Sequence, residues 1–308
     1  MAVVDTADHP KTPAATAAAA SVTGPAPADA ASTAASGRRP GWLRLLISLL
    51  PLILLAVVAV IGPWITPYDP ERVAGPSSKG PSGDHWFGTD GSGLDVLSQL
   101  LAATRTNVGV ATVVVLLATA GGAFLGLLTG MNESSRGPRG VLARVVGRAV
   151  DFIQAVPGML VGLVAVAFYG ASLTTLVATL AIVLAPLQAR LVRTEVLRVR
   201  SDAYVDAARL AGLSELRLTL RHVLPNSCRP ALENISVIFA VSIILTASLG
   251  FLGAGLPPPH PEWGSMISRG ATDAAVGRWW PATFPTIALI LTVAIMASSA
   301  AKLFGRRR

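Results

Sequence analysis

Residues 152–189 have the sequence FIQAVPGMLVGLVAVAFYGASLTTLVATLAIVLAPLQA, which contains no charged side chain. A helix needs only about 20 apolar residues to cross a bilayer, so this run is long enough for two crossings. Its middle holds Tyr169-Gly170-Ala171-Ser172, a composition that is typical of a tight turn. We therefore expect two membrane-spanning helices joined by this turn.

Four further uncharged stretches lie elsewhere in the chain, at residues 45–68, 106–132, 234–261 and 279–301. Together, the uncharged stretches predict six membrane-spanning helices, near residues 45–64, 107–130, 152–169, 172–189, 234–255 and 281–301. Only 14% of the residues are charged, against about 25% in typical soluble domains. A single stretch of this kind fits a buried helix of a soluble protein, but five do not. The predicted fold class is all-α, a polytopic membrane protein.

The basic residues are distributed unevenly among the segments between the spans. With the N-terminus in the cytoplasm, the cytoplasmic segments hold 20 of the 25 Lys and Arg, and the extracytoplasmic segments hold five. An excess of Lys and Arg marks the cytoplasmic side of membrane proteins. Both termini are therefore predicted to be cytoplasmic, and the protein is expected in the cell (inner or cytoplasmic) membrane. The net charge of +8 then reflects topology and indicates no nucleic-acid partner.

The segments near the N-terminus differ in composition. Residues 1–41 are rich in Ala, Pro, Thr and Ser and are expected to form a disordered cytoplasmic tail. The apolar run that follows is too long for the core of a signal peptide, about 7–15 residues, so residues 42–64 are interpreted as the first span. Residues 65–105 are interpreted as an extracytoplasmic loop. Within it, apolar spacing predicts an amphipathic interfacial helix over residues 90–104, although a plain exposed loop is the alternative. The last two segments are the membrane core, 106–301, and a basic cytoplasmic tail, 302–308.

Several kinds of chemistry are excluded by missing residues. No Gly-Lys pair occurs, so the chain lacks a P-loop that would hold a nucleotide phosphate. No predicted span has an acid or base near its middle, where ion-coupled transporters usually carry one. Cys228 is the single cysteine, which excludes an intrachain disulfide, and the four His have no metal-site spacing. We therefore expect no catalytic, cofactor or metal site in this chain.

The fifth predicted span contains hydroxyl side chains, which can line a passage for a polar solute without holding it. These candidates for a translocation pathway are Ser236, Ser242, Thr246 and Ser248. Because the chain has neither a nucleotide site nor a charge within the membrane, the energy for transport has to come from a partner protein.

The cytoplasmic segment at residues 201–225 has a helical pattern of its own. Ser201 suits an N-cap and Gly212 suits the position after a C-cap, which predicts a short helix between them. A second helix is predicted to begin at Ser214 and to stop before Pro225. Small residues leave room for another backbone, and arginines are available to acidic partners: Ala207, Ala208 and Ala211, with Arg209, Arg217 and Arg221. From the pattern alone, a docking knob and an ordinary amphipathic loop both remain open.

The order Asp206-Ala207-Ala208, then Gly212, then Leu224-Pro225 resembles the EAA motif of ABC-importer permeases. In that motif Glu-Ala-Ala is followed after three residues by Gly and, after nine more, by Ile-x-Leu-Pro, and the spacing here is the same. Asp206 in place of Glu keeps the charge, and His222 in place of Ile is expected to pack rather than to sense pH. The resemblance implies which residues couple the chain to ATPase subunits: Asp206, Ala207, Ala208, Gly212, Leu224 and Pro225.

Three further segments resemble the C-type permeases of dipeptide, oligopeptide and nickel importers. The segment that begins at Phe87-Gly88-Thr89-Asp90 is similar to their FGTDxxGRDVLSR, with Leu94 and Gln99 in place of two arginines. The segments Phe251-Leu252-Gly253-Ala254-Gly255 and Pro261-Glu262-Trp263-Gly264 are similar to their FLGLG…PP.P.WG loop. The resemblance extends over roughly residues 42–300 and implies the type I permease fold of ABC importers.

The resemblance also implies the partners. They are a B-type permease subunit, two cytoplasmic ATPase subunits that carry ATP and Mg, an extracytoplasmic solute-binding protein, and membrane lipid. Dipeptides or oligopeptides are the expected solutes, and nickel or another small solute is the alternative. From another class of proteins, an ion-coupled secondary transporter and a purely structural membrane protein remain alternatives.

Overall fold

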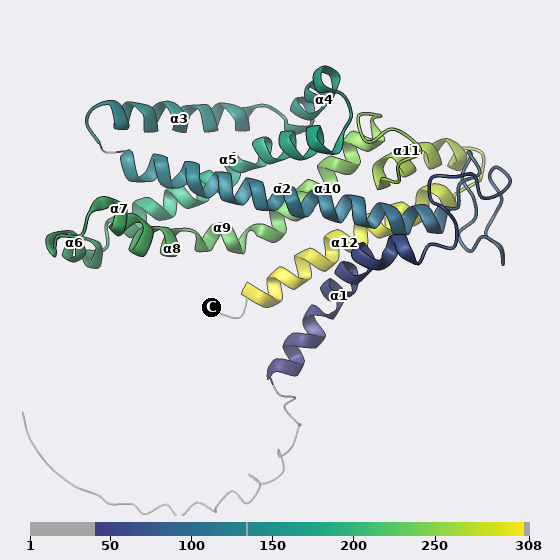
Figure 1. Cartoon of the computed structure of the whole chain (residues 1–308), viewed down its shortest axis with the longest axis horizontal. Coiled ribbons are helices and arrows are strands. Elements are labelled where there is room, and N and C mark those ends of the chain that lie inside the picture. The colour runs from purple at the N-terminus through teal and green to yellow at the C-terminus, as the bar shows by residue number, and fades with distance from the viewer. Residues whose placement is uncertain (1–40, 134, 305–308) are drawn as a thin grey trace, which may run out of the picture. The chain divides into compact units, whose positions relative to one another are not determined.

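The computed structural model describes residues 41–133 and 135–304 (Figure 1). Its longer helices are α1 (Gly41–Ile61), α2 (Val96–Asn132), α3 (Pro138–Ala155), α4 (Gly158–Tyr169), α5 (Leu173–Arg200), α10 (Ile235–Phe251), α11 (Trp263–Ala274) and α12 (Trp280–Phe304). Shorter elements are η1 (Gly62–Trp64), α6 (Ala203–Leu210), α7 (Glu215–Leu218), η2 (Thr219–Val223), α8 (Leu224–Ser227) and α9 (Arg229–Glu233). Within the described residues the only β-type pairing is one isolated bridge, so the all-α prediction is confirmed there. Residues 1–40 of the predicted tail and residues 305–308 lie outside them.

The described helices include three that are long and apolar enough to cross a membrane: α2, α5 and α12. Two bent pairs raise the number to as many as five, namely α3 with α4 and the Glu215–Glu233 helices with α10. The remaining predicted span, 42–64, corresponds to α1 and η1, whose apolar part Leu49–Trp64 is shorter than a full span. The structure thus supports three to five crossings, and six crossings with both termini cytoplasmic remain a prediction.

The centre of the fold is the packing of α2 against α5, which lie side by side (Figure 1). Three glycines spaced four residues apart, Gly122, Gly126 and Gly130, allow the two backbones to approach. A Cβ added at Gly126 would lie 2.5 Å from the carbonyl oxygen of Ala189, and one at Gly130 would lie 2.7 Å from Cγ1 of Val196. Small residues at this spacing are how helices pack closely in membranes, where apolar burial alone gives no preference between helix and lipid.

The helix predicted over residues 152–169 is not continuous in the structure. The chain breaks between α3 and α4, whose axes differ by 92°. Val156 is extended, with φ −89° and ψ 130°, because the residue before a proline is disfavoured in the helical region, and Pro157 follows it. The uncharged run therefore holds the end of α3, all of α4 and the start of α5.

The separate interfacial helix expected over residues 90–104 is also not found. One continuous helix, α2, runs through 37 residues from Val96, a length of about 55 Å. Asp95 begins it, since its side chain accepts a hydrogen bond from the backbone N–H of Ser98. The apolar residues of the predicted interfacial face lie against protein instead, as the burial of Leu94 and Val96 indicates. The pattern does not produce a polar face, because the interleaved Asp95, Ser98 and Gln99 are buried as well.

Candidate functional site

The first element of the predicted coupling segment is α6, which ends as the sequence predicted. Gly212 has φ +84°, a left-handed conformation that glycine adopts at no steric cost. Its N–H donates to the carbonyl of Arg209, and the N–H of Leu213 donates to the carbonyl of Ala208. These two bonds form a Schellman motif, which satisfies carbonyls that the end of a helix leaves free.

The start of α6 differs by one residue from the prediction. Ser201, expected as the N-cap, is instead the C-cap of α5, and its hydroxyl donates to the carbonyl of Arg198 at 2.7 Å. Asp202 occupies the N-cap position of α6, although its side chain makes no capping bond there. The helix α5 is thus longer than the apolar run predicts, because its polar continuation keeps the helical conformation as far as Arg200.

The second predicted helix does not stop before Pro225. It begins at Glu215 as α7, widens into the π-helical segment η2, and continues through Pro225 as α8. The widening is visible in a bond from the N–H of Leu224 to the carbonyl of Thr219, five residues back. A proline has no N–H to donate and clashes with the carbonyl four residues earlier. The wide turn shifts the hydrogen-bond register at that point, and π-type turns of this kind are often found at functional sites.

The elements α6–α9, named here the α6–α9 block, are fastened to the end of α5 by apolar packing. Val205, Leu218 and Val223 are fully buried, and they pack in one cluster with the valines of α5 and Ala231. Complete burial of a side chain of this size contributes roughly 1.5–3 kcal/mol. The α6–α9 block is therefore held on the end of α5 by buried apolar contacts.

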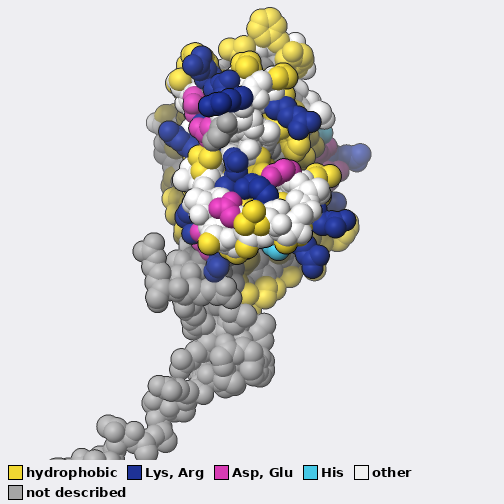
Figure 2. All heavy atoms as spheres, turned by 90° about the vertical axis from the view of Figure 1, so that its left-hand side faces the viewer, with side chains coloured by type: hydrophobic (Ala, Val, Ile, Leu, Met, Phe, Trp, Pro, Cys, Tyr) yellow, Lys and Arg dark blue, Asp and Glu magenta, His cyan; other side chains and the backbone are white. Residues whose placement is uncertain are grey.

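The outer surface of the α6–α9 block is exposed and partly apolar. Leu210 is 90% exposed and Leu216 is 70% exposed. Figure 2 looks onto this end of the molecule and shows Lys and Arg side chains spread among acidic and apolar ones. These two leucines are apolar side chains that another protein or the membrane could cover.

One arginine that was predicted to be free for a partner is already occupied. The guanidinium of Arg209 donates to Glu215 at 2.8 Å and to Asp206 at 3.0 Å. The bond to Glu215 raises the pKa of Arg209, which is charged at neutral pH in any case. Arg217 and Arg221 are exposed and form no ion pair with another described residue. These two, rather than Arg209, fit the predicted role.

The six predicted coupling residues lie on two neighbouring parts of the α6–α9 block. Asp206, Ala207 and Pro225 are exposed. Ala208 and Leu224 are half-buried, and Gly212 occupies the exposed turn. The amide of Asn226, the residue after Pro225, donates to the hydroxyl of Tyr204 on α6 at 3.1 Å. This bond ties the two halves of the motif together.

The four hydroxyls proposed for a pathway lie on α10 but not on one face of it. Ser242 and Thr246 are fully buried, and Ser242 donates to the carbonyl of Ile238 at 2.7 Å. Ser248 points about 160° away from Thr246 around the helix, where it lines a cavity of about 420 Å³. Ser236 is half-buried near the start of α10. The structure thus separates Ser248 from the two buried hydroxyls.

A buried glutamine near the α6–α9 block was missed by the sequence reasoning. Gln188 on α5 donates to the hydroxyl of Thr119 on α2 at 2.9 Å and to the carbonyl of Ala231 on α9 at 3.1 Å. It also accepts from Asn234 at the start of α10, at 3.3 Å. A buried amide without partners would be costly, so this node holds four elements in one arrangement. The sequence feature that could have identified Gln188 is a polar amide near the end of the uncharged run 152–189.

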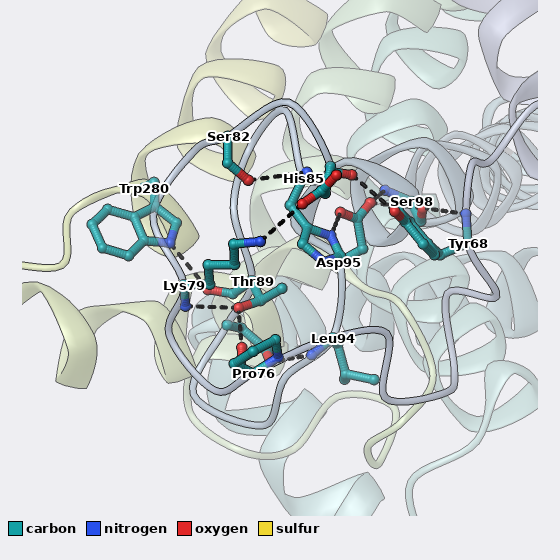
Figure 3. Close-up of polar contacts among 12 residues, drawn as sticks. Tyr68, Pro76, Lys79, Ser82, His85, Thr89, Leu94, Asp95, Ser98 and Trp280 are labelled. Atoms are coloured by element: carbon teal, nitrogen blue, oxygen red, sulfur yellow. Dashed lines mark hydrogen bonds and ion pairs between the residues drawn. The ribbon is translucent and has the colours of Figure 1, made fainter.

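The opposite end of the molecule, named here the loop end, consists of residues 65–95 and α11. Its motif residues Thr89, Asp95 and Ser98 point toward other residues of this loop rather than away from it (Figure 3). Asp95 accepts from Nδ1 of His85 at 2.9 Å and from the hydroxyl of Ser98 at 2.7 Å, and all three are buried. Trp280 donates to the carbonyl of Thr89 at 3.0 Å. These residues fix the loop on α2 and α12, which is a structural role.

Besides Asp95, two further carboxyl groups are buried at the loop end. Glu262 caps α11 by accepting from the N–H groups of Gly264 and Ser265, each at 2.8 Å. Burial raises the pKa of Glu262 above its ordinary value, against the opposing effect of those bonds. Burial likewise raises the pKa of Asp90, which Arg269 opposes. A Cβ at Gly250 would overlap the Glu262 carboxylate, so this group sits directly on the end of α10.

Comparison with known proteins relates the chain to transport permeases. It is 34% identical over 247 residues to a putative peptide transport system permease protein of Brucella suis biovar 1, with 80% of this chain and 81% of that one covered. It is 35% identical over 244 residues to the glutathione transport system permease protein GsiD of Pectobacterium atrosepticum, with 79% of each covered. It is also 35% identical over 254 residues to the di/tripeptide transport system permease protein DppC of Pseudomonas aeruginosa, with 80% and 81% covered.

The fold has relatives among solved structures. The MetNI methionine ABC transporter in an inward facing conformation matches with a TM-score of 0.55 at 17% identity, over 67% of this chain and 94% of that one. Residues 122–308 match the model of the family described as binding-protein-dependent transport system inner membrane component. The chain therefore belongs to this family, as a multi-pass inner membrane protein that forms the non-catalytic permease part of an ABC transporter.

Proposed function

We propose that this chain is one of two permease subunits of an ATP-driven importer of dipeptides or oligopeptides, and that its α6–α9 block docks an ATPase subunit. The observation that carries the proposal is the exposed Asp206-Ala207 surface of α6, with the left-handed turn at Gly212 beside it. Small side chains let a partner's backbone approach, and the buried cluster beneath prevents the surface from yielding when it is pushed.

The proposed solute follows from the relatives. Their printed names refer to peptides, to di- and tripeptides and to glutathione, and all three are amide-linked. Each of these relatives matches about four fifths of this chain. A peptide solute is therefore the proposal, with recognition shared with the external binding protein that the family description implies.

The proposed orientation puts the α6–α9 block in the cytoplasm. The excess of Lys and Arg in the segments on that side supports it. The exposed tryptophans Trp64, Trp86 and Trp279 lie in or directly beside the loop end, and tryptophan is enriched at both surfaces of a membrane, which is compatible with this orientation. In this orientation the block faces the ATPase subunits and the loop end faces the binding protein.

In the proposed mechanism, ATP closes the pair of ATPase subunits and displaces the α6–α9 block. Because Val205 and its neighbours bind the block to α5, that helix moves with it. The Gln188 node then carries the movement to α2 and to the start of α10. The helices rock, the pathway opens outward to receive solute from the binding protein, and hydrolysis resets it inward.

A place on this pathway is proposed for Ser248 rather than for Ser242 or Thr246. Ser248 lines the cavity beside α10 together with Met159 and Phe251. The other two hydroxyls are buried against the protein core. The remaining hydroxyl of the set, Ser236, lies near the Gln188 node and is proposed to move with it.

The proposal is tested by Gly212→Asp, with Gly277→Asp as its matched control. The two glycines have nearly the same φ, +84° and +85°, and a Cβ at either would meet no atom within 4 Å. The backbone strain of the two substitutions is therefore alike, and only Gly212 lies in the proposed docking surface. Uptake of radiolabelled trialanine and co-purification of ATPase subunits are measured in membranes with equal amounts of each variant.

We expect Gly212→Asp to abolish both uptake and ATPase co-purification, because a bulky charge occupies the surface that the partner approaches. Gly277→Asp should retain both. Full uptake by Gly212→Asp, or equal loss in the two variants, would contradict docking at this turn.

A further inference from the structure

A groove next to the α6–α9 block is not used by the proposed coupling. Its volume is about 520 Å³, and it lies between the last turns of α2, the start of α3, the end of α5 and the helices α6 and α7. Its walls therefore come from both the membrane helices and the α6–α9 block.

The floor of the groove is apolar. Phe124, Leu127, Leu128 and Met131 of α2 line it on one side, and Leu216 of α7 lines it on the other. Phe124 is 66% exposed although it belongs to the uncharged run 106–132. A phenyl ring is more stable against hydrocarbon than against water, so the floor suits an acyl chain.

The rim of the groove is basic. Three arginines line it, Arg139, Arg200 and Arg209, against the single carboxylate of Glu215. Arg200 is held in place, because its Nη1 donates to the carbonyls of Gly130 and Met131. Its Nε is buried, so Nη2, which makes no hydrogen bond to a described residue, is the nitrogen left for an anion. Arg139 is exposed and forms no ion pair with any described residue, so both can still bind an anion.

The depth of the groove matches the boundary of the membrane. Gly126 packs on Ala189, the last residue of one uncharged run, and Gly130 packs on Val196 within the basic part of α5. The apolar floor thus adjoins the uncharged runs, and the arginines lie just beyond them. In the orientation of the proposed function, this is the headgroup level of the cytoplasmic leaflet, which is rich in anionic lipid.

We propose that the groove binds one anionic phospholipid, with its phosphate between Arg139 and Arg200 and an acyl chain against Phe124. Basic pockets between membrane helices on the cytoplasmic side are known to suit anionic headgroups. Because α6 and α7 form the opposite wall, the bound lipid braces the α6–α9 block against the end of α2. The inference rests on the proposed function only for its orientation.

The test is lipid retention by the importer purified through an affinity tag on the full-length chain. The complex is placed in nanodiscs of equal parts phosphatidylglycerol and phosphatidylcholine, and retained lipid is identified by native mass spectrometry. The variant Arg139→Gln removes one rim charge. Arg148→Gln removes the same charge from the same helix, at an exposed position that does not line the groove.

The unaltered complex should retain phosphatidylglycerol in preference to phosphatidylcholine, and Arg139→Gln should reduce that preference about fivefold, the effect of one basic residue at an anionic surface. Arg148→Gln should leave it unchanged. A second variant, Phe124→Ala, should lower retention of both lipids, whereas Leu117→Ala, exposed elsewhere on α2, should not.

Equal effects of Arg139→Gln and Arg148→Gln would overturn the proposal, since they would indicate general attraction to the surface. It would also be overturned if no lipid were retained and Arg139→Gln weakened ATPase co-purification, because the groove would then be covered by that subunit. Retention is measured without ATP or solute. Lipid retention can therefore be lost while trialanine uptake persists, and it can persist when uptake is lost, so the two proposals are tested separately.

Discussion

The α6–α9 block and the loop end use charged residues in opposite ways. In the α6–α9 block the charged side chains are exposed, as in the group formed by Arg209, Asp206 and Glu215, and apolar burial with the buried hydrogen bond from Gln188 to Ala231 holds the block on α5. The loop end also has exposed pairs, such as Arg72 with Asp69, but unlike the block it holds carboxyl groups inside the protein, and Asp95, with its partner His85, is almost completely buried. Exposed ion pairs stabilise little, whereas the loss of one partner from a buried pair is costly.

This contrast explains how two motifs with similar polar composition can have different roles. Most polar atoms of the loop-end motif are bonded within the loop end itself, since Asp90, Asp95 and Glu262 all accept bonds from neighbouring backbone N–H groups, and only Oδ2 of Asp90 among their carboxylate oxygens has no hydrogen bond to a described residue. The polar atoms of the α6 motif are left at the surface, where a partner can reach them. One motif is thus suited to build a rigid surface, and the other to be approached by a second protein.

The largest effect is expected for Asp95→Ala. The substitution removes the N-cap of α2 and leaves His85 and Ser98 buried without their common acceptor. We expect the free energy of unfolding to fall by about 3–5 kcal/mol, the usual cost of breaking a buried pair. Titration of the purified chain with sodium dodecyl sulfate, followed by tryptophan fluorescence, measures it. A loss below about 1 kcal/mol would mean that the two ends do not differ as described.

A smaller effect is expected from pH at the loop end. The folded pKa of Glu262 is raised by burial above its ordinary value of 4.5. The folded state therefore takes up the proton before the unfolded state does, so stability rises as pH falls through the folded pKa towards 4.5. Hydrogen exchange of α11, corrected for intrinsic rates, should show increasing protection over this range. Glu262→Gln should reduce the slope, and an unchanged slope would assign the effect to another group.

The smallest effect is expected for Arg209→Ala in the α6–α9 block. Its guanidinium is 41% exposed and both its partners are more exposed still. Solvent screens such pairs, so we expect the free energy of unfolding to change by less than about 1 kcal/mol. The same detergent titration measures it, beside Asp95→Ala. A loss as large as that of Asp95→Ala would show that the block depends on its ion pairs and not on apolar packing.

Much of the fold could be predicted because its signals are local. Uncharged runs located the apolar helices, since a bilayer imposes length and composition on each segment separately. The turn at Gly212 was predicted correctly because a left-handed residue at a helix end strongly favours glycine. The end of α5 was not, because a helix continues through polar residues once α2 packs against it.

Two prolines behave differently from what the sequence predicted: Pro157 lies within the helix predicted over residues 152–169, and the second helix of the coupling segment was predicted to stop before Pro225. At Pro157 the helix is interrupted, because the preceding Val156 is extended, and α4 continues at 92° to α3. Pro225 lies within a helical stretch, because the π-helical segment before it accommodates the missing donor. Proline always removes one backbone N–H donor, but the surrounding structure decides whether the helix is interrupted there or continues with a shifted hydrogen-bond pattern.

The membrane class, the family and the position of the α6 motif could be predicted from the sequence, because each depends on residue types at fixed spacing. Which polar groups are exposed and which are buried depends on the tertiary structure. Asp206 and Asp95 are both aspartates in motif segments, yet one is exposed and the other binds His85 within the protein. Gln188 joins helices that are 69 and 43 residues distant along the chain. Such pairings depend on which helices pack together, and the local spacing of residues in the sequence does not predict that packing.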